Sequence, residues 1–371
     1  MTKPTPLHRH RGKSHGFTLV ELMVGLALGL LTVLVITQVI VVSEGKKRTL
    51  TMGSDAQVNG ALSIFTIQRD VQMAGYGASV IPDALGCATK GKRDSDAEFS
   101  FTLAPVVIAA GASGAPDQVT VLLSTKAGFS VPMITSENHP QSTDYFVVKS
   151  SFGAVAGDVM IAVPKLQSAD VGCAVFNVNP SGSSLLTTTQ IPHASGTNGK
   201  WNSSSVFPTD GYPDGSYLLN MGSLAQRTYS VSTSNALQMA ERSAAVSTPL
   251  QQELYSGIVN LQALYGKDTD GDGVIDKYDK TSPTTNDGWR QVLAVRIAVV
   301  ARSNQPERDE VTTTQPQWDL GNVTVGDLTP SNCYTNSKCV PLKVDQASDW
   351  KNYRYKVYDT VIPLRNVLWN S

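Results

Sequence analysis

The clearest feature of the chain is an apolar run from Phe17 to Val42. It contains one charged side chain, Glu21, and three threonines and one glutamine as its other polar groups. A helix needs about 20 apolar residues to cross a bilayer. The pattern therefore predicts a membrane-spanning helix over about 17–42.

After Ser43 the pattern becomes amphipathic and continues to about Ala74. Val58, Leu62 and Phe65 recur there at helical spacing, with polar residues between them. We expect this second half of the helix to lay its apolar stripe against a globular head. Glycines at 75 and 77 follow the last periodic turn, as at many helix ends. The helix is therefore expected over 17–76 and the head over 77–371.

Short runs of β-branched and aromatic residues, separated by Gly, Pro, Asp or Ser, follow in the head. A tract rich in Gly, Ser, Asn and Pro at 192–215 predicts a loop instead. A long N-terminal helix packed on an antiparallel β-sheet head with long loops belongs to the α+β class. The predicted strands are 117–123, 145–149, 159–163, 174–178, 217–219, 227–231, 258–265, 292–300 and 353–357.

The residues before the apolar run form a short leader with four basic and no acidic side chains. A signal peptide has an apolar region of only about 7–15 residues and a small-residue cleavage site, which Val41-Val42-Ser43-Glu44 is not. An ordinary anchor leaves Glu21 unexplained, because an unpaired carboxylate near the membrane centre costs about 2.5–3.5 kcal/mol. The uniformly apolar surface argues against a buried core helix.

The heptapeptide Gly16-Phe17-Thr18-Leu19-Val20-Glu21-Leu22 resembles the type III leader of type IV pilins and type II secretion pseudopilins. This resemblance implies that a membrane prepilin peptidase removes residues 1–16, cutting after Gly16, and methylates the new terminus at Phe17. It also implies that Glu21 neutralises the terminal ammonium of a neighbouring subunit in the filament. Such pairing makes a buried carboxylate tolerable.

Charge and motifs exclude several other functions. The net charge is −1, or −5 without the four basic leader residues, and no basic patch suggests nucleic-acid binding. Two histidines lie beyond the leader, His139 and His193, both in polar stretches where a surface position is expected. No nucleophile motif or zinc motif is present, so we expect a peptidase substrate and not an enzyme.

Four cysteines, all beyond the leader, indicate disulfide bonds. An even number in an exported chain suggests two bridges. Three pairings are possible from sequence alone, and we favour Cys333–Cys339 closing a small loop and Cys87–Cys173 joining distant parts of the head.

The segment 268–279 has the spacing of a 12-residue calcium loop. Carboxylates stand at its first, third, fifth, ninth and twelfth places, with glycine at the sixth. The alternative is an acidic hairpin without metal, but a bound dication offsets the repulsion between neighbouring carboxylates. We expect structural Ca²⁺, although the final Asp replaces the usual Glu and a strand, not a helix, precedes the loop. The expected ligands are Asp268, Asp270, Asp272, Asp276 and Asp279 with the Val274 carbonyl.

Two further segments, Arg69–Tyr76 and Pro363–Asn366, resemble the helix end and the C-terminus of minor pilins of the PilW family. The resemblance implies a minor pilin that primes or caps the tip of a type IV pilus. Its implied partners are other minor and major pilins, the prepilin peptidase, the inner-membrane assembly platform and a tip adhesin. The implied location is the inner membrane, with the head in the periplasm, and later the pilus tip or cell surface.

Two alternatives stay open from the sequence. A minor pseudopilin of a type II secretion system shares the leader and the helix. A single-pass anchored calcium-binding adhesion domain shares the helix and the acidic loop, but predicts no cleavage after Gly16.

Overall fold

The computed structural model describes residues 16–124, 126, 130–168 and 171–368. The chain divides into two compact units, residues 1–53 and residues 54–371. Helix α1 (Leu19–Met73) supplies the apolar segment of the first unit and the opening segment of the second. The second unit is otherwise mainly β-sheet, so the predicted α+β class is confirmed.

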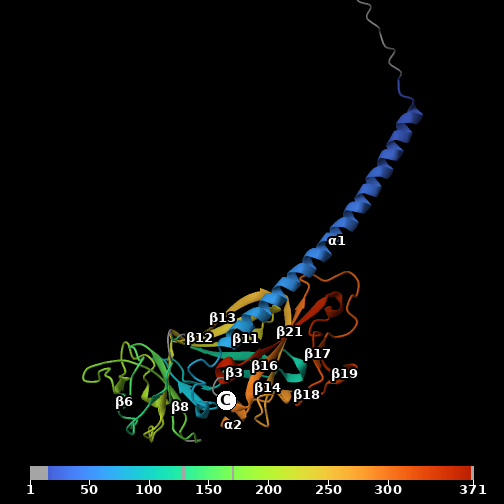
Figure 1. Ribbon diagram of the computed structural model, residues 1–371. Coiled ribbons are helices and arrows are strands. Elements are labelled where there is room, and N and C mark those ends of the chain that lie inside the picture. The colour runs from blue at the N-terminus through green and yellow to red at the C-terminus, as the bar shows by residue number, and fades with distance from the viewer. Residues whose placement is uncertain (1–15, 125, 127–129, 169–170, 369–371) are drawn as a thin grey trace, which may run out of the picture. The chain divides into compact units, whose positions relative to one another are not determined.

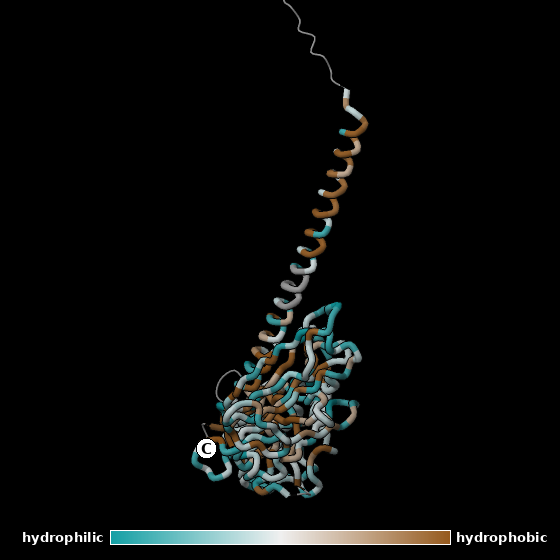
Figure 2. The backbone as a smooth tube through the Cα atoms, turned by 90° about the vertical axis from the view of Figure 1, so that its right-hand side faces the viewer, coloured by the Kyte–Doolittle hydropathy of each residue, from teal (hydrophilic) through white to brown (hydrophobic). Residues whose placement is uncertain are grey.

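In the first unit, Leu19–Gly45 is the one stretch of described helix long and apolar enough to cross a membrane. Its mean hydropathy reaches 2.6 over an 18-residue window, and none of that window is buried within the structure. Figure 2 shows apolar residues following one another along this segment with few polar interruptions.

Two five-stranded sheets surround the second part of α1 (Figure 1). All strand pairs in the first sheet and most in the second are antiparallel. The first has the order β13 (Val246–Ser256), β12 (Ala236–Ser243), β11 (Leu224–Val231), β4 (Gln118–Ser124), β3 (Val106–Ala109). The second has the order β18 (Thr324–Val325), β15 (Lys277–Asp279), β14 (Ile258–Lys267), β16 (Val292–Arg302), β21 (Tyr355–Pro363).

A third sheet of six strands is built from the chain between the helix and β11. Its order is β2 (Phe99–Thr102), β1 (Ala88–Gly91), β8 (Cys173–Asn177), β7 (Val159–Val163), β10 (Tyr217–Gly222), β5 (Met133–Ile134). Smaller elements complete the head: the pair β6 (Tyr145–Val147) and β9 (Gln190–Pro192), the sheet β17 (Gln317–Gly321), β20 (Ser337–Pro341), β19 (Ser331–Tyr334), and the helices α2 (Asn286–Arg290) and α3 (Arg365–Leu368).

All nine predicted strands overlap strands of the structure, although the last, 353–357, begins two residues before β21 (Tyr355–Pro363) and ends six residues before its end. The prediction missed several strands, among them β1 to β3 and the β12–β13 hairpin. Most residues of β1, β12 and β13 are polar or small, and β2 and β3 are only four residues long. The tract 192–215 lacks long strands, as predicted, but it is not a simple surface loop. Val206, Phe207 and Tyr212 are buried in it.

The predicted apolar stripe of α1 is wrong. Val58, Leu62 and Phe65 are 52%, 41% and 61% exposed. The face turned into the head consists mostly of small residues, since the strands approach the helix closely. A Cβ on Gly60 would lie 2.3 Å from a ring carbon of Tyr358. The buried residues on this face are Ala56, Gly60, Ser63, Ile67, Asp70, Val71 and Ala74.

Candidate functional site

Thr18 and Glu21 cap the N-terminus of α1 through reciprocal hydrogen bonds. The backbone N–H and the hydroxyl of Thr18 each donate to Glu21 Oε2 at 3.0 Å, and the Glu21 N–H donates to Thr18 Oγ1 at 3.3 Å. This is the capping box that Ser/Thr-x-x-Glu sequences form. The sequence analysis missed it, although Thr18-Leu19-Val20-Glu21 carries the signal.

The predicted processing site lies just before this cap. Gly16 and Phe17 precede the first helical residue, and Phe17 is 87% exposed. The bond between them is therefore outside the helix, where backbone can enter a peptidase site without unwinding a turn. Cleavage after Gly16 and methylation of Phe17 remain predictions.

The acidic segment forms the connection between β14 and β15. Single carboxylate oxygens of Asp268, Asp270 and Asp276 lie within 4.8 Å of one another. Strands flank the loop on both sides, as the sequence indicated for its N-terminal side. Oxygen ligands from Asp carboxylates are those that Ca²⁺ takes, so the three side chains fit this ion by chemistry and proximity.

The loop is shaped by bonds from its own backbone to these carboxylates. Asp268 accepts from Gly271 N–H at 2.6 Å and from Gly273 N–H at 2.8 Å. Asp272 accepts from Val274 N–H at 2.7 Å. Both glycines have φ near +80°, a conformation that L side chains rarely adopt. The turn that brings the carboxylates together therefore depends on glycine at 271 and 273.

Electrostatics distinguish two exposed members of the loop. The N–H of Asp272 donates to Asp270 and favours its charged form, but the charges of Asp272 and Asp276 outweigh this and raise the pKa of Asp270. The pKa of Asp276 is lowered, because the backbone N–H and hydroxyl of Thr269 donate to it. Crowding of like charge at Asp270 is the condition that a bound dication relieves.

Asp279, the expected closing ligand, is placed elsewhere. Its side chain is 2% exposed, and its two oxygens lie 2.7 Å from Lys267 Nζ and 3.1 Å from Lys277 Nζ. The reason is that β15 begins at Lys277, so the pairing of β14 with β15 closes the loop after Asp276. The twelfth position thus belongs to the strand, and its carboxylate forms ion pairs at the base of the loop.

A pocket of about 740 Å³ opens beside this loop. Asp268, Asp270 and Asp272 form one side, while Leu85 and Leu293 contribute apolar surface. The open pocket gives solvent ions a route to the carboxylates.

A second polar cluster joins the end of α1 to the head. Asp70 is 2% exposed and accepts from Arg227 Nη1 at 2.9 Å and from the Tyr229 hydroxyl at 2.6 Å. Arg227 also donates to Glu241 at 2.7 Å. Burial and the bond to Asp70 raise the pKa of Tyr229, which keeps the donating proton in place. We call Asp70, Arg227, Tyr229 and Glu241 the helix joint.

The C-terminal segment reaches the same helix end. Asn366 Nδ2 donates to the carbonyls of Ala74 at 2.8 Å and Met73 at 3.4 Å. These are carbonyls that a helix C-terminus leaves without intrahelical partners. Gly75 follows at φ +74° and donates its N–H to Leu122. The two segments chosen for their family resemblance, 69–76 and 363–366, are therefore in direct contact.

Comparison with known families agrees with this geometry. Residues 226–366 match the family model of the type IV pilus-assembly protein W, PilW, and residues 11–37 match the prokaryotic N-terminal methylation motif. These two segments are similar to those of a PilW-family prepilin-type protein. No curated protein and no solved structure matches it. Pilin-type proteins are structural and in general not enzymes, and the apolar N-terminal helix fits a membrane-anchored pilin.

The PilW match contains Arg227, Tyr229, the acidic loop and Asn366, and Asp70 reaches it from α1. The sequence analysis noted the phrase around Asp70 only as a resemblance. Its physical basis was not visible, because a carboxylate in an amphipathic helix usually faces solvent. Arg227 and Tyr229 stand two residues apart in a predicted strand, a weak sign of one face.

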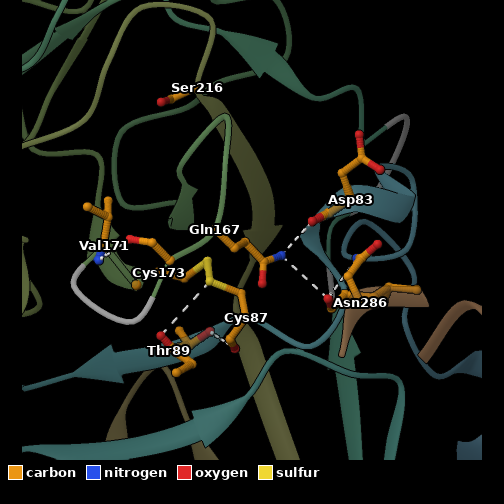
Figure 3. The surroundings of a disulfide bond; sticks show 12 residues. Asp83, Cys87, Thr89, Gln167, Val171, Cys173, Ser216 and Asn286 are labelled. Carbon is orange, nitrogen blue, oxygen red and sulfur yellow. Dashed lines mark hydrogen bonds between the residues drawn. A yellow bond between two sulfur atoms is a disulfide. The ribbon is translucent and has the colours of Figure 1, made fainter. Parts of the chain in front are cut away.

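Both favoured disulfides are formed. Cys87, just before β1, bonds Cys173 at the start of the neighbouring strand β8, and Cys333 bonds Cys339 within the β19–β20 hairpin. Figure 3 shows the first bridge beside Gln167 and Asn286. Gln167 donates to the carbonyls of Asp83 and Leu85, and Asn286 donates to Leu85 at 2.9 Å. The bridge therefore lies beside a hydrogen-bonded turn at 82–85.

The two histidines beyond the leader are not on the surface, contrary to the prediction. His139 and His193 are 3% and 5% exposed, with Nε2 atoms 2.8 Å apart. Burial lowers the pKa of His139 to about 4, and burial with the charge of its neighbour lowers that of His193 to about 3. Phe146 stacks on His139 at 3.8 Å between ring centroids. The pair is a neutral part of an aromatic core.

Proposed function

We propose that this protein is a minor pilin that primes or caps the tip of a type IV pilus together with other minor pilins. The observation that best supports this proposal is that one chain matches the N-terminal methylation motif near its start and the PilW model toward its end. These matches support a minor pilin role in the type IV pilus. The tip position and the head's periplasmic orientation before assembly are part of the proposal.

The exposed stripe of α1 supports contact with neighbouring subunits. Val58, Leu62 and Phe65 are large apolar side chains at the spacing of one helix face, and the head leaves them uncovered. An apolar helix of another pilin would bury this surface. We propose major and minor pilins as these neighbours, and the assembly platform and a tip adhesin as further partners.

Glu21 has a second task in this proposal. Both contacts from Thr18 end on Oε2. The other oxygen would accept from the methylated terminal ammonium of a neighbouring subunit. The cap holds the carboxylate in one place, and the neighbour supplies the opposite charge that makes its burial tolerable.

The test of this part combines processing with assembly. Mass analysis of the membrane-extracted protein, with and without prepilin peptidase, should give a chain that begins at N-methylated Phe17 only when the peptidase is present. Glu21→Gln keeps an acceptor for Thr18 but removes the charge, so pilus incorporation should fall while the head's melting temperature stays unchanged. Thr18→Val is the matched control for the cap. An unprocessed chain under both conditions would favour the anchored binding domain.

We further propose that Ca²⁺ binds the loop through Asp268, Asp270 and Asp276, with Asp272 and the Val274 carbonyl as neighbouring oxygen donors. The ion would hold the β14–β15 loop in one conformation, and the proposed role is structural. Its support is the cluster of three carboxylates and the raised pKa of Asp270.

Calorimetric titration with Ca²⁺ tests this site directly. Asp270→Asn should weaken binding at least tenfold, because it removes one charge of a three-carboxylate set. Asp287→Asn is the control, since its side chain lines the same pocket but is 88% exposed and lies outside the cluster. Asp279→Asn should lower stability rather than calcium affinity. Equal heats for the wild type and Asp270→Asn would contradict the site.

A type II secretion pseudopilin shares the leader and helix, and piliation of a deletion strain separates the two. Loss of pili with normal secretion supports the pilus role, and the reverse result supports the alternative.

A further inference from the structure

Two sheet edges flank the second part of α1. At one flank, Asn59 Nδ2 donates to the carbonyl of Ser256 at 3.0 Å, at the end of β13. At the other, the Tyr358 hydroxyl of β21 donates to the carbonyl of Gln57 at 3.2 Å. Strands β13 and β21 are the terminal strands of the two five-stranded sheets. Figure 1 shows them on either side of α1 within the head.

The hydrogen-bond pattern of β11 and β12 determines which backbone groups of β13 point away from the sheet. Ala244 N–H donates to Leu224, and Ser232 N–H donates to Ala236, so the even-numbered residues of β12 bond to β11. Odd residues of β12 therefore bond to β13, where Met239 faces Gln252 and Glu241 faces Leu250. The backbone groups of β13 that turn outward are those of Pro249, Gln251 and Glu253.

The same reasoning applies to β21. The Leu364 N–H donates to the Leu293 carbonyl, and the Ser303 N–H donates to the Arg354 carbonyl. The backbone groups of even-numbered residues in β21 are therefore hydrogen-bonded to β16. The outward backbone groups belong to Tyr355, Val357, Asp359 and Val361. Among the residues that the structure describes, none of these outward groups on either strand has a hydrogen-bond partner.

Both edges also carry proline in the outward position, at Pro249 and Pro363. Proline offers no N–H there and limits pairing to the rest of the strand. Apart from these prolines, each edge strand has outward backbone N–H and C=O groups that could pair with another strand. On β13, Leu250 is 65% exposed and the six residues 248–253 are all exposed, an unusual length for an unprotected edge.

We infer that β13 of one subunit pairs with β21 of a second copy, as antiparallel strands. An extended strand is the partner that an open row of backbone groups recognises. The register follows from the side chains: Gln251 faces Val357, which sets Leu250 opposite Tyr358 and Gln252 opposite Lys356. Glu253 then faces Tyr355 and stays far from Asp359. A shift by four residues would place Glu253 directly opposite Asp359, two like charges.

The two edges are different surfaces, so this contact is heterologous. Each subunit keeps one edge free after pairing, so such contacts extend into rings or open arrays and do not form a two-fold dimer. The helix stripe of Leu62 and Phe65 lies between the edges, next to Thr66, whose hydroxyl bonds Tyr255 of β13 at 3.0 Å. Strand pairing and helix packing would thus use adjoining surfaces of the subunit.

Cysteine cross-linking of the full-length chain in lipid vesicles tests this register. All four native cysteines are in disulfides, so single engineered thiols report alone. Gln252→Cys on one copy and Lys356→Cys on another form a non-hydrogen-bonded pair, with Cα atoms about 4.5 Å apart, within disulfide range. We expect oxidation to join them at least fivefold more than it joins Gln251→Cys to Lys356→Cys, since residue 251 points to the opposite face.

A backbone variant provides the second measurement. Gln251→Pro removes an outward N–H but no bond to β12, so it should abolish the 252–356 cross-link without lowering the melting temperature. Gln252→Pro breaks a bond to β12 and should lower that temperature. Equal cross-linking from 251 and 252, or no cross-link at all, would overturn the inference. Cleavage after Gly16 is measured on the same samples, so failure in correctly processed chains contradicts this contact and leaves the pilin role standing.

Discussion

Two regions of the head bury polar groups by different means. Around α1, in and beside the part that matches PilW, the helix joint buries a charged carboxylate between a guanidinium and a tyrosine hydroxyl. In the six-stranded region, outside both family matches, the buried polar pair is His139 with His193, both neutral, in an aromatic cluster. The helix joint therefore keeps its charges, whereas the histidine pair is neutral.

The difference follows from the partners available. Asp70 has Arg227 at 2.9 Å, and Arg227 has Glu241 in addition, so opposite charges are balanced across two elements. Within the described part of the chain, neither histidine has a carboxylate among its bonded side chains, so protonation of either would carry the full cost of desolvation. A joint held by charge should fail when one charge is removed, whereas the neutral region should fail when protons or reductants are added.

The largest effect is expected at the helix joint. Asp70→Ala leaves Arg227 and the Tyr229 hydroxyl without their buried acceptor, and the free energy of unfolding should fall by about 3–5 kcal/mol. Denaturant unfolding measures it. Arg69→Ala is the neighbouring control: its side chain is 60% exposed, and its loss should change stability by about 0.5 kcal/mol or less. Similar losses for both variants would mean that the joint is not held by its charge.

The next effect concerns the bridge of the six-stranded region. Replacing both Cys87 and Cys173 with alanine opens a loop of 86 residues and should cost about 2–4 kcal/mol. The same change at Cys333 and Cys339 opens a separation of only 6 residues. Loop entropy alone makes that loss smaller by about 2 kcal/mol. Thermal unfolding of the two double variants would contradict this ranking if the short bridge mattered more.

The smallest effect at neutral pH, and one that grows in acid, is a pH dependence from the histidine pair. Because the folded pKa values lie below the ordinary 6.5, the unfolded chain binds more protons as the pH falls through 6.5. Stability is therefore complete above about pH 7 and decreases toward pH 4, by up to about 1.4 kcal/mol per pH unit for each histidine. His139→Gln should flatten this slope in unfolding curves taken at several pH values. An unchanged slope would show that other groups control the acid response.

Long periodic segments made much of this fold predictable. The apolar run of α1, the short apolar run 159–163, the alternating strand 292–300 and the acidic segment 268–279 were visible in the sequence, because each has a clear run, period or spacing of ligands. The disulfide pairing was only one of three possibilities, and the structure forms that one.

Other features depend on contacts between residues far apart in the chain. Hydrophobic periodicity chose the wrong face of α1, because close packing against Tyr358 requires Gly60 and not a large side chain. Asp279 has the spacing of a calcium ligand, but it lies in β15, where the pairing of β15 with β14 places its carboxylate in an ion pair with Lys267. His139 and His193 lie 54 positions apart, so nothing local to either one signals that they meet in a core.

The cap at the start of α1 has a consequence for the timing of maturation. Thr18 and Glu21 both lie after the predicted cut, and the helix begins at Leu19. Removing residues 1–16 would leave every bond of the cap in place. The bonds of the cap would therefore be the same before and after the cut, so the start of the helix would not change whether the peptidase acts early or late.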